Sequence, residues 1–158
     1  MDKKIFYITR AKLEEFKKEY NELLEIERQK TVGQEAPKIF ESENMNPEFV
    51  TFQEDMGFLR SRIDELREIL ENYEIIKNPP KDKAGEVRIG ATVKVDINGI
   101  KDNFTIVGTL EANPALGKIS NESLVGKALL GRKIGEEVVI DSPVKRTYKI
   151  KSIKYEVS

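Results

Sequence analysis

A coiled-coil stripe of apolar residues is the strongest constraint on how this chain folds. Between residues 49 and 73, apolar side chains recur at alternating steps of three and four in a segment that is otherwise almost wholly charged: Phe49, Phe52, Met56, Leu59, Ile63, Leu66, Leu70 and Tyr73. This spacing is typical of a seam that packs against a partner helix. It predicts a helix from Pro47 to Tyr73, about 40 Å long at about 1.5 Å per residue.

A partner helix is predicted upstream in the same chain. The same spacing is found at Leu13, Phe16, Tyr20 and Leu23, and the stripe is widened by Leu24 and Ile26. Thr9 is a suitable N-cap for this helix, and Asn46 before Pro47 is a suitable N-cap for the second one. The pattern therefore predicts an antiparallel helical hairpin within residues 1–77.

The segment that joins the two helices is the least regular part of the hairpin. Gly33 and Pro37 interrupt the first helix before it matches the second in length, which leaves Phe49 and Phe52 without an obvious partner. Three apolar residues could fold back and cover them: Val32, Ile39 and Phe40. The alternative is an exposed apolar tip.

Composition excludes several classes of function. The chain has no cysteine and no histidine, so disulfides, thiolate or imidazole metal sites and histidine-based catalysis are excluded. No apolar run reaches the roughly 18 residues of a membrane span, and the first ten residues lack the apolar core of a signal peptide. We expect a cytoplasmic protein of one or two domains with no membrane partner.

The charges divide the chain into an acidic half and a basic half. Residues 1–77 carry 13 basic and 18 acidic side chains, net −5, whereas residues 78–158 carry 14 and 10, net +4. An acidic hairpin is unsuited to lie along nucleic acid, and its charges also fit a solvated coiled-coil surface. Four residues are candidates for a basic surface on the second half: Lys127, Arg132, Lys133 and Lys145.

A second domain is predicted after Asn78-Pro79-Pro80, where a helix cannot continue. A polar linker over 78–85 would separate it from the hairpin and place its start at residue 86. Alternating apolar residues predict a strand over 87–97 that ends at Asn98-Gly99, a pair typical of tight hairpin turns.

The rest of this domain, over 86–158, is predicted to be a small antiparallel sheet with one short helix. The helix is expected over Ser120 to Leu130, with Gly131 after its end. Further strands are expected over 104–107, 138–140 and 148–155, with three inward side chains in the last: Tyr148, Ile150 and Ile153. The predicted fold class is α+β.

Several short motifs resemble a known family when they are taken in order. In the second domain these are Phe104-Thr-Ile-Val-Gly108, Glu111-Ala112, Ile119-Ser120, Ala128-Leu-Leu-Gly131, Gly135-Glu-Glu-Val-Val139, Tyr148-Lys-Ile150 and Ile153-Lys-Tyr155. In the hairpin they are Tyr7-Ile8-Thr9, Asn46-Pro-Glu-Phe49, Gly57-Phe58 and Arg62-Ile63. Together they resemble the GreA/GreB family of bacterial transcript-cleavage factors, whose C-terminal domain has an FKBP-like fold.

The resemblance implies a partner and a mode of action. The family's C-terminal domain docks at the rim of the secondary channel of bacterial RNA polymerase, and its coiled coil enters the channel. Acidic tip residues then help the polymerase active centre to hold Mg²⁺, so that the polymerase cleaves backtracked RNA. The factor is therefore not an enzyme, acts as a monomer, binds no Mg²⁺ stably alone, and contacts nucleic acid only through the polymerase. The docking residues expected here are Ser120, Ser123, Lys127 and Gly131.

The tip is where this sequence departs from the family pattern. When Asn46-Pro47-Glu48-Phe49 is aligned with the family's tip, the two family acids fall on Ser42 and Met45. Glu41 and Glu43 lie beside these positions and are the candidate catalytic and metal-binding residues, because Mg²⁺ prefers carboxylate oxygens. The candidate tip contacts are Ile39, Phe40, Asn44, Met45 and Asn46.

Three hypotheses remain open from the sequence. The first is a factor that stimulates transcript cleavage with Glu41 and Glu43. The second is a regulator of the same fold that occupies the channel without stimulating cleavage, because the family's tip acids are displaced or missing and Glu41 and Glu43 are solvated loop residues. The third is a coiled-coil adaptor unrelated to polymerase.

Overall fold

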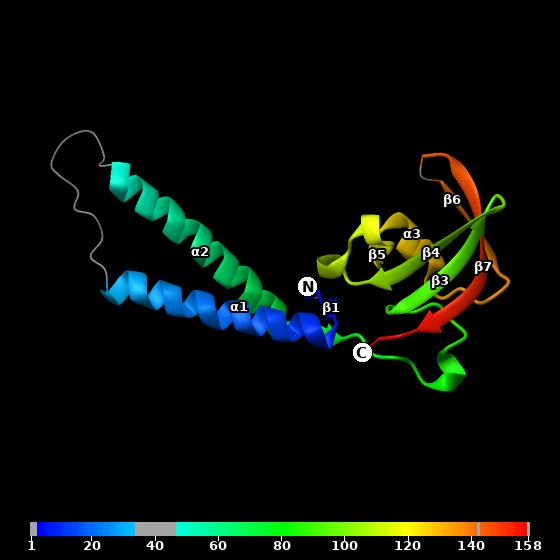
Figure 1. Ribbon diagram of the computed structural model, residues 1–158, viewed down its shortest axis with the longest axis horizontal. Helices are drawn as coiled ribbons and strands as arrows, with labels where there is room; N and C mark the ends of the chain where they lie inside the picture. The colour runs from blue at the N-terminus through cyan, green and yellow to red at the C-terminus, as the bar shows by residue number, and fades with distance from the viewer. Residues whose placement is uncertain (1–2, 34–46, 142, 158) are drawn as a thin grey trace. The chain divides into compact units, whose positions relative to one another are not determined.

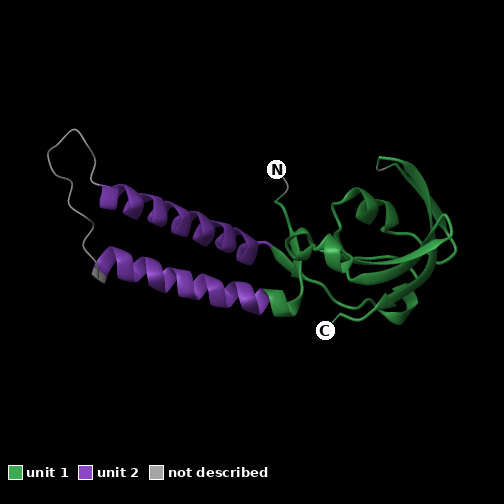
Figure 2. Cartoon of the chain, turned by 45° about the horizontal axis from the view of Figure 1, so that its top comes forward, with its two compact units in different colours: residues 1–12, 73–158 green, residues 13–72 purple. Residues whose placement is uncertain are grey.

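The computed structural model describes residues 3–33, 47–141 and 143–157 and divides the chain into two compact units. One unit is helical and comprises Leu13–Asn72. The other comprises Met1–Lys12 together with Tyr73–Ser158 and contains the sheets (Figure 2). This contact-based division groups the first twelve residues with the sheets. The sequence-based domain limits at residues 77 and 86 stay a prediction about folding units.

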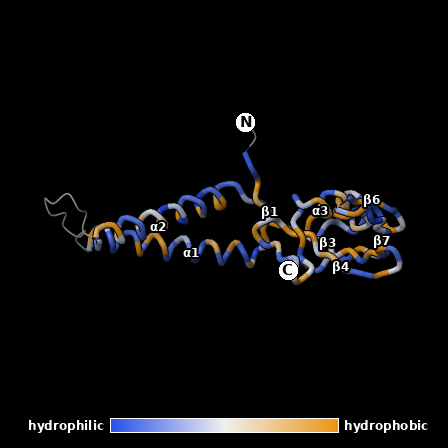
Figure 3. Tube along the Cα trace, turned by 90° about the horizontal axis from the view of Figure 1, so that it is seen from above, coloured by the Kyte–Doolittle hydropathy of each residue, from blue (hydrophilic) through white to orange (hydrophobic). Residues whose placement is uncertain are grey.

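The helical unit is the predicted hairpin of two long helices (Figure 1). Helix α1 spans Arg10–Arg28 and helix α2 spans Pro47–Glu71. Along both helices, apolar and polar residues alternate at helical spacing (Figure 3). The predicted seam is confirmed at the predicted residues that are buried: Leu13, Phe16, Met56, Ile63 and Leu66. Near the end of α2 the buried residue is Ile69, which was not predicted, whereas the predicted Leu70 is only partly buried. The predicted cap is confirmed as well, because the Thr9 hydroxyl accepts the N–H of Lys12 at 3.2 Å.

Polar side chains join α1 to α2 along the edges of the seam. The guanidinium of Arg62 donates two hydrogen bonds to the carboxylate of Glu19, at 2.7 and 2.9 Å, and lies over the ring of Phe16. The hydrogen bond to Glu19 is the main reason why the pKa of Arg62 is raised. Arg67 donates to the Tyr20 hydroxyl at 3.3 Å. These cross-helix bonds favour one antiparallel register of the two helices.

The ends of the helices differ from the prediction in three respects. Helix α2 ends at Glu71, and Tyr73 is an exposed strand residue rather than a member of the seam. Helix α1 continues into a π-helical turn over Gln29–Gly33, where the Thr31 hydroxyl bonds back to the carbonyl of Glu27. Val32 is 78% exposed, so it does not cover Phe49 or Phe52.

The C-terminal part of the other unit is a curled five-stranded sheet in the order β5-β4-β3-β7-β6 (Figure 1). Its strands are β3 (Ala91–Ile97), β4 (Ile100–Val107), β5 (Lys118–Ser120), β6 (Glu137–Asp141) and β7 (Lys145–Tyr155). All pairings are antiparallel except that of β4 with β5. The predicted α+β class is confirmed. The predicted antiparallel sheet is confirmed for β3, β4, β6 and β7. Strand β5, which the sequence analysis did not predict, pairs parallel with β4, because the chain crosses over between them through two short 3₁₀ turns, Thr109–Glu111 and Pro114–Leu116.

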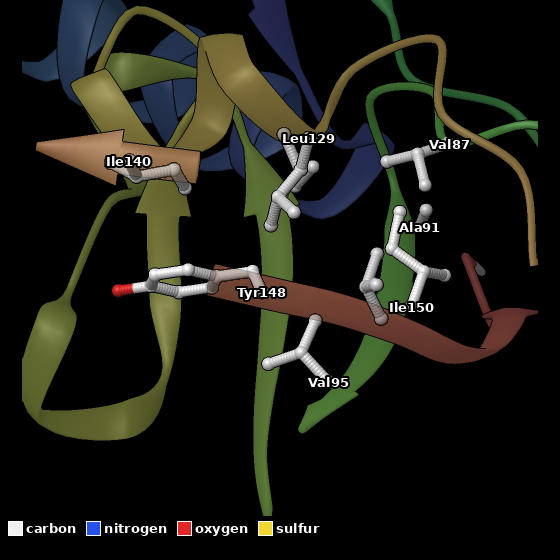
Figure 4. Close-up of a cluster of buried hydrophobic side chains, with 9 residues drawn as sticks. Val87, Ala91, Val95, Leu129, Ile140, Tyr148 and Ile150 are labelled. Carbon is white, nitrogen blue, oxygen red and sulfur yellow. The ribbon is translucent and has the colours of Figure 1, made fainter. Parts of the chain in front are cut away.

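The core of this unit lies between one sheet face and the short helix α3, Leu124–Leu129 (Figure 4). Leu129 of α3 packs among apolar residues that the strands and the segment before β3 contribute. The buried cluster comprises Val87, Ala91, Val93, Val95, Ile106, Leu129, Ile140, Tyr148 and Ile150. Alternate residues of each strand therefore face α3, and the intervening residues face away from it.

The turns of this unit lie where the sequence predicted them, but the boundaries of two elements differ from the prediction. The hairpin turn is confirmed, because Asn98 and Gly99 have φ of 51° and 90°. Strand β3 begins at Ala91 rather than at residue 87. Helix α3 is shorter than predicted, because Ser123 is its N-cap and Ser120 belongs to β5. Gly131 follows the helix with φ of 82°, as expected for a helix end.

A β-bulge in β7 shifts its inward-facing residues from even to odd positions. The pairing of β7 with β3 shifts between Lys94 and Val95, so that one extra residue of β7 stands opposite this point. This shift explains why Tyr148 and Ile150 are buried at even positions whereas Ile153, which packs against the same core, is at an odd one. The three predicted inward residues are therefore confirmed.

The structure contains a two-stranded parallel sheet that the sequence analysis did not predict. Strand β1, Phe6–Ile8, pairs with strand β2, Tyr73–Ile75, and the N–H of Ile76 donates to the carbonyl of Ile8 at 2.9 Å. The Glu111 carboxylate accepts two hydrogen bonds from Thr9, from its N–H at 3.0 Å and its hydroxyl at 2.7 Å. The N-terminal strand and the first residue before α1 are thus bound to the turn after β4.

Gly108 is required where this turn meets β1. A Cβ added at Gly108 would lie 1.8 Å from the carbonyl oxygen of Tyr7, which is backbone and cannot rotate away. We predict that Gly108→Ala lowers the free energy of unfolding by about 2 kcal/mol or more, measured by urea denaturation. The control is Gly85→Ala, where a Cβ meets nothing within 4 Å and no loss is expected. Equal stability of Gly108→Ala and wild type would contradict the close approach.

The ion pair between the helices also gives a measurable expectation. A double-mutant cycle of Arg62→Ala and Glu19→Ala should yield a coupling of about 0.5–1 kcal/mol, because the pair is bidentate but about one-third exposed. The same cycle on Arg28 and Glu25, an exposed pair within α1, should give a smaller coupling. A coupling between Arg62 and Glu19 no larger than in that control would show that the pair does not stabilise the hairpin.

Candidate functional site

The predicted tip residues lie outside the part of the chain that the structure describes. They are Ile39, Phe40, Glu41, Glu43, Asn44, Met45 and Asn46, so their predicted roles stay predictions. Within residues 3–33, 47–141 and 143–157, no group of three or more acidic side chains is placed to hold a metal ion. The proposed Mg²⁺ ligands therefore depend on the sequence alone.

The helix ends nearest to this segment are exposed. Thr31 and Val32 at the end of the π-helical turn, and Pro47 and Glu48 at the start of α2, are all solvent-accessible. Glu48 lies in the first turn of α2, where a carboxylate stabilises the positive end of the helix dipole. The segment with the predicted tip acids thus connects two ends that lie on the surface of the helical unit.

The predicted docking residues lie around α3, and two of them are engaged in local hydrogen bonds. The Ser123 hydroxyl accepts the N–H of Gly126 at 3.1 Å and donates to the carbonyl of Ser120 at 2.6 Å. The Ser120 hydroxyl accepts the N–H of Glu122 and is 2.8 Å from the Thr109 hydroxyl. Both serines are only half-exposed, so their direct effect is to shape the start of α3.

The outward face of α3 is the accessible part of this region. Lys127 is exposed, and Gly131 is exposed just after the helix. Leu124, three residues before Lys127, is 55% exposed and shares its face. The sequence analysis predicted a helix over this stretch but did not separate its outward residues from its inward ones, so it missed Leu124. The signal was its spacing, since Val125 and Leu129 form the inward row.

The four residues proposed for a basic surface do not form one cluster of unpaired charges. Arg132 is 3.7 Å from Glu136 and donates to the carbonyl of Ala128, so it is held against its own segment. Lys127 lies on α3, Lys133 follows it, and Lys145 begins β7 opposite Asp141. These positions belong to different parts of the surface.

Comparison with known proteins decides the family. Residues 81–155 match the family model for the C-terminal part of transcription elongation factors GreA/GreB. The chain is 40% identical to the transcription elongation factor GreA of Thermomicrobium roseum over 138 residues, which cover 86% of this chain and 88% of the relative. The chain belongs to the GreA/GreB family. It is also 35% identical to GreA of Mycoplasma capricolum over 98% of its length and 100% of the relative.

The GreA/GreB assignment rests on these sequence relatives. A solved GreA/GreB structure from Nitrosomonas europaea is 20% identical, with a TM-score of 0.44 over 95% of this chain and 99% of that one, which is too low to add to the assignment. Among the described residues, no helix has the length and apolar character needed to cross a membrane.

The cap of α3 allows a direct test of the region around it. We predict that Ser123→Ala lowers the free energy of unfolding by about 1 kcal/mol, because the N–H of Gly126 loses its acceptor and α3 loses its N-cap. Urea denaturation measures the change. Ser61→Ala, an exposed position inside α2, is the control and should not destabilise the protein. If both variants unfold like wild type, the Ser123 hydroxyl does not fix the helix start.

Proposed function

We propose that this chain is a transcription elongation factor that binds bacterial RNA polymerase at its secondary channel and stimulates the cleavage of backtracked RNA by the polymerase. The observation that supports this function best is the 40% identity to a GreA factor over 86% of the chain. The folded form agrees with it, because the described helices form the hairpin on which such a factor depends. The chain acts through the nuclease activity of the polymerase and catalyses no step alone.

The hairpin is suited to present its connecting segment. Apolar packing at Phe16, Ile63 and Leu66 and the bonds of Arg62 to Glu19 hold α1 against α2. Residues 34–46 join the end of the first helix to the start of the second along the chain. Glu41 and Glu43 lie in this segment, and two carboxylates this close in sequence can serve one cation.

The role of Glu41 and Glu43 in this proposal is that of added oxygen ligands. Mg²⁺ held by the polymerase supplies the charge that activates a water molecule and stabilises the leaving oxygen. The two carboxylates would complete the oxygen coordination and accept hydrogen bonds from the water. Because the chain has no histidine or cysteine, carboxylates are its only strong candidates for this task.

The surface around α3 is the proposed contact with the rim of the channel. Leu124 supplies an exposed apolar side chain, and Lys127 supplies a positive charge on the same face. An apolar residue beside a charged one is a common composition for a protein contact of moderate size. Ser120 and Ser123 act in this contact by fixing the start of the helix.

A transcript-cleavage assay tests the proposal. Stalled, backtracked elongation complexes incubated with the wild-type protein should yield shortened transcripts, and Glu41→Ala/Glu43→Ala should reduce the cleavage rate at least about tenfold, because the added ligands are lost. Binding of the variant to core polymerase should stay near that of wild type. The control variant Glu22→Ala/Glu68→Ala removes the same charge from exposed positions of α1 and α2 and should cleave like wild type.

The other outcomes separate the remaining hypotheses. If the wild-type protein binds the polymerase and competes for the channel but yields no shortened transcripts, it is a regulator without cleavage competence. If the wild-type protein does not bind core polymerase, the third hypothesis, a coiled-coil adaptor unrelated to polymerase, is the one that remains. If the control variant loses as much cleavage as Glu41→Ala/Glu43→Ala, the acids act through the charge of the hairpin rather than at its tip.

A further inference from the structure

The sheet face opposite α3 carries a concentration of lysines. Lys94 of β3 alternates with the buried Val93 and Val95, so it points away from the core. The register places Lys101 opposite Asp96 and Lys154 opposite Thr92, and residues directly opposite each other share a face. Strands β4, β3 and β7 are adjacent in the sheet (Figure 1), so these lysines are neighbours.

The bulge in β7 adds a fourth lysine to this face. Without the shift between Lys94 and Val95, regular alternation would place Lys151 and Ser152 on opposite sides of the sheet. Instead both line one hollow of about 450 Å³. Its complete lining is Lys94, Asp96, Lys101, Lys151, Ser152 and Lys154. We call the four exposed lysines of this set, Lys94, Lys101, Lys151 and Lys154, the lysine face.

The positive charge of the lysine face is not neutralised within the described part of the chain. The single acid of the hollow, Asp96, accepts the N–H of Gly99 at 2.7 Å and so serves the hairpin turn. Among the described residues, none of the four lysines has a carboxylate oxygen within 4.0 Å. With four lysines against one aspartate, the hollow carries a formal net charge of +3, and a positive field of this kind attracts anions.

The composition of the hollow indicates the chemistry of its partner. None of its six lining residues is aromatic or apolar. Protein interfaces have apolar and aromatic centres and are depleted in lysine, and single-stranded nucleic acid is bound by stacking on aromatic rings. Lysines with polar neighbours instead suit the phosphate backbone of a duplex, which needs point charges and no stacking.

We propose that the lysine face binds the phosphate backbone of duplex DNA without sequence preference. This adds a nucleic-acid contact to a chain that was expected to reach nucleic acid only through the polymerase. The proposal is independent of transcript cleavage, because it concerns other residues and its DNA-binding measurement needs no polymerase. It follows from the strand register, the β7 bulge and the use of Asp96 by the turn.

Fluorescence anisotropy with a labelled random-sequence DNA duplex tests the proposal on the full chain. With four phosphate contacts, the slope of log K against log salt should be about −3 to −4, a loss of about a hundredfold in affinity between about 50 and 200 mM salt. Lys94→Gln/Lys101→Gln/Lys151→Gln/Lys154→Gln should reduce this slope to near zero. The corresponding four arginine substitutions should retain it.

A matched control removes four exposed lysines from elsewhere: Lys18→Gln/Lys77→Gln/Lys81→Gln/Lys83→Gln. It should keep the wild-type slope, and thermal denaturation should show that both glutamine variants are folded. Equal losses of DNA affinity in the lysine-face variant and the control variant would overturn the proposal, because net charge alone would then explain binding. Tighter binding of a single strand than of the duplex would also overturn it, as would a lysine-face variant that loses affinity for polymerase but not for DNA.

Discussion

The parallel pairing of β1 with β2 is the constraint on which much of the structure depends. Strand β1 immediately precedes α1 and β2 follows α2, so the pairing holds the start of one helix beside the end of the other. The turn after β4 supports this pair, since Gly108 admits the carbonyl of Tyr7 and the Glu111 carboxylate accepts hydrogen bonds from the N–H and the hydroxyl of Thr9. A side chain at Gly108 would act on three segments that are distant in sequence.

The sequence predicted the long elements and missed the short ones for a physical reason. Helices α1 and α2 repeat their apolar spacing often enough for the period to be unambiguous. Strands β1, β2 and β5 have three residues each, too few to show a period of two, and their partners are set by tertiary contacts. Tyr73 illustrates the limit, because its spacing extended the seam by one step beyond the true helix end.

The candidate sites were predictable to different degrees. The family motifs indicated the tip and the α3 region, but which groups around α3 are accessible depended on the cap at Ser123 and on the outward position of Leu124. The lysine face could not be read from the sequence. Lys94, Lys101, Lys151 and Lys154 are separated by up to 60 positions, and only the strand order and the bulge bring them together.

The bonds between Thr9 and Glu111 bear on how the chain forms during synthesis. The Thr9 hydroxyl can cap α1 as soon as Lys12 exists, because that bond is local. Its anchoring carboxylate lies 102 residues further along, so the anchor is absent while most of the chain is being made. Helix α1 therefore carries its own cap as soon as it is made, but its attachment to the turn after β4 can form only after Glu111 has been added.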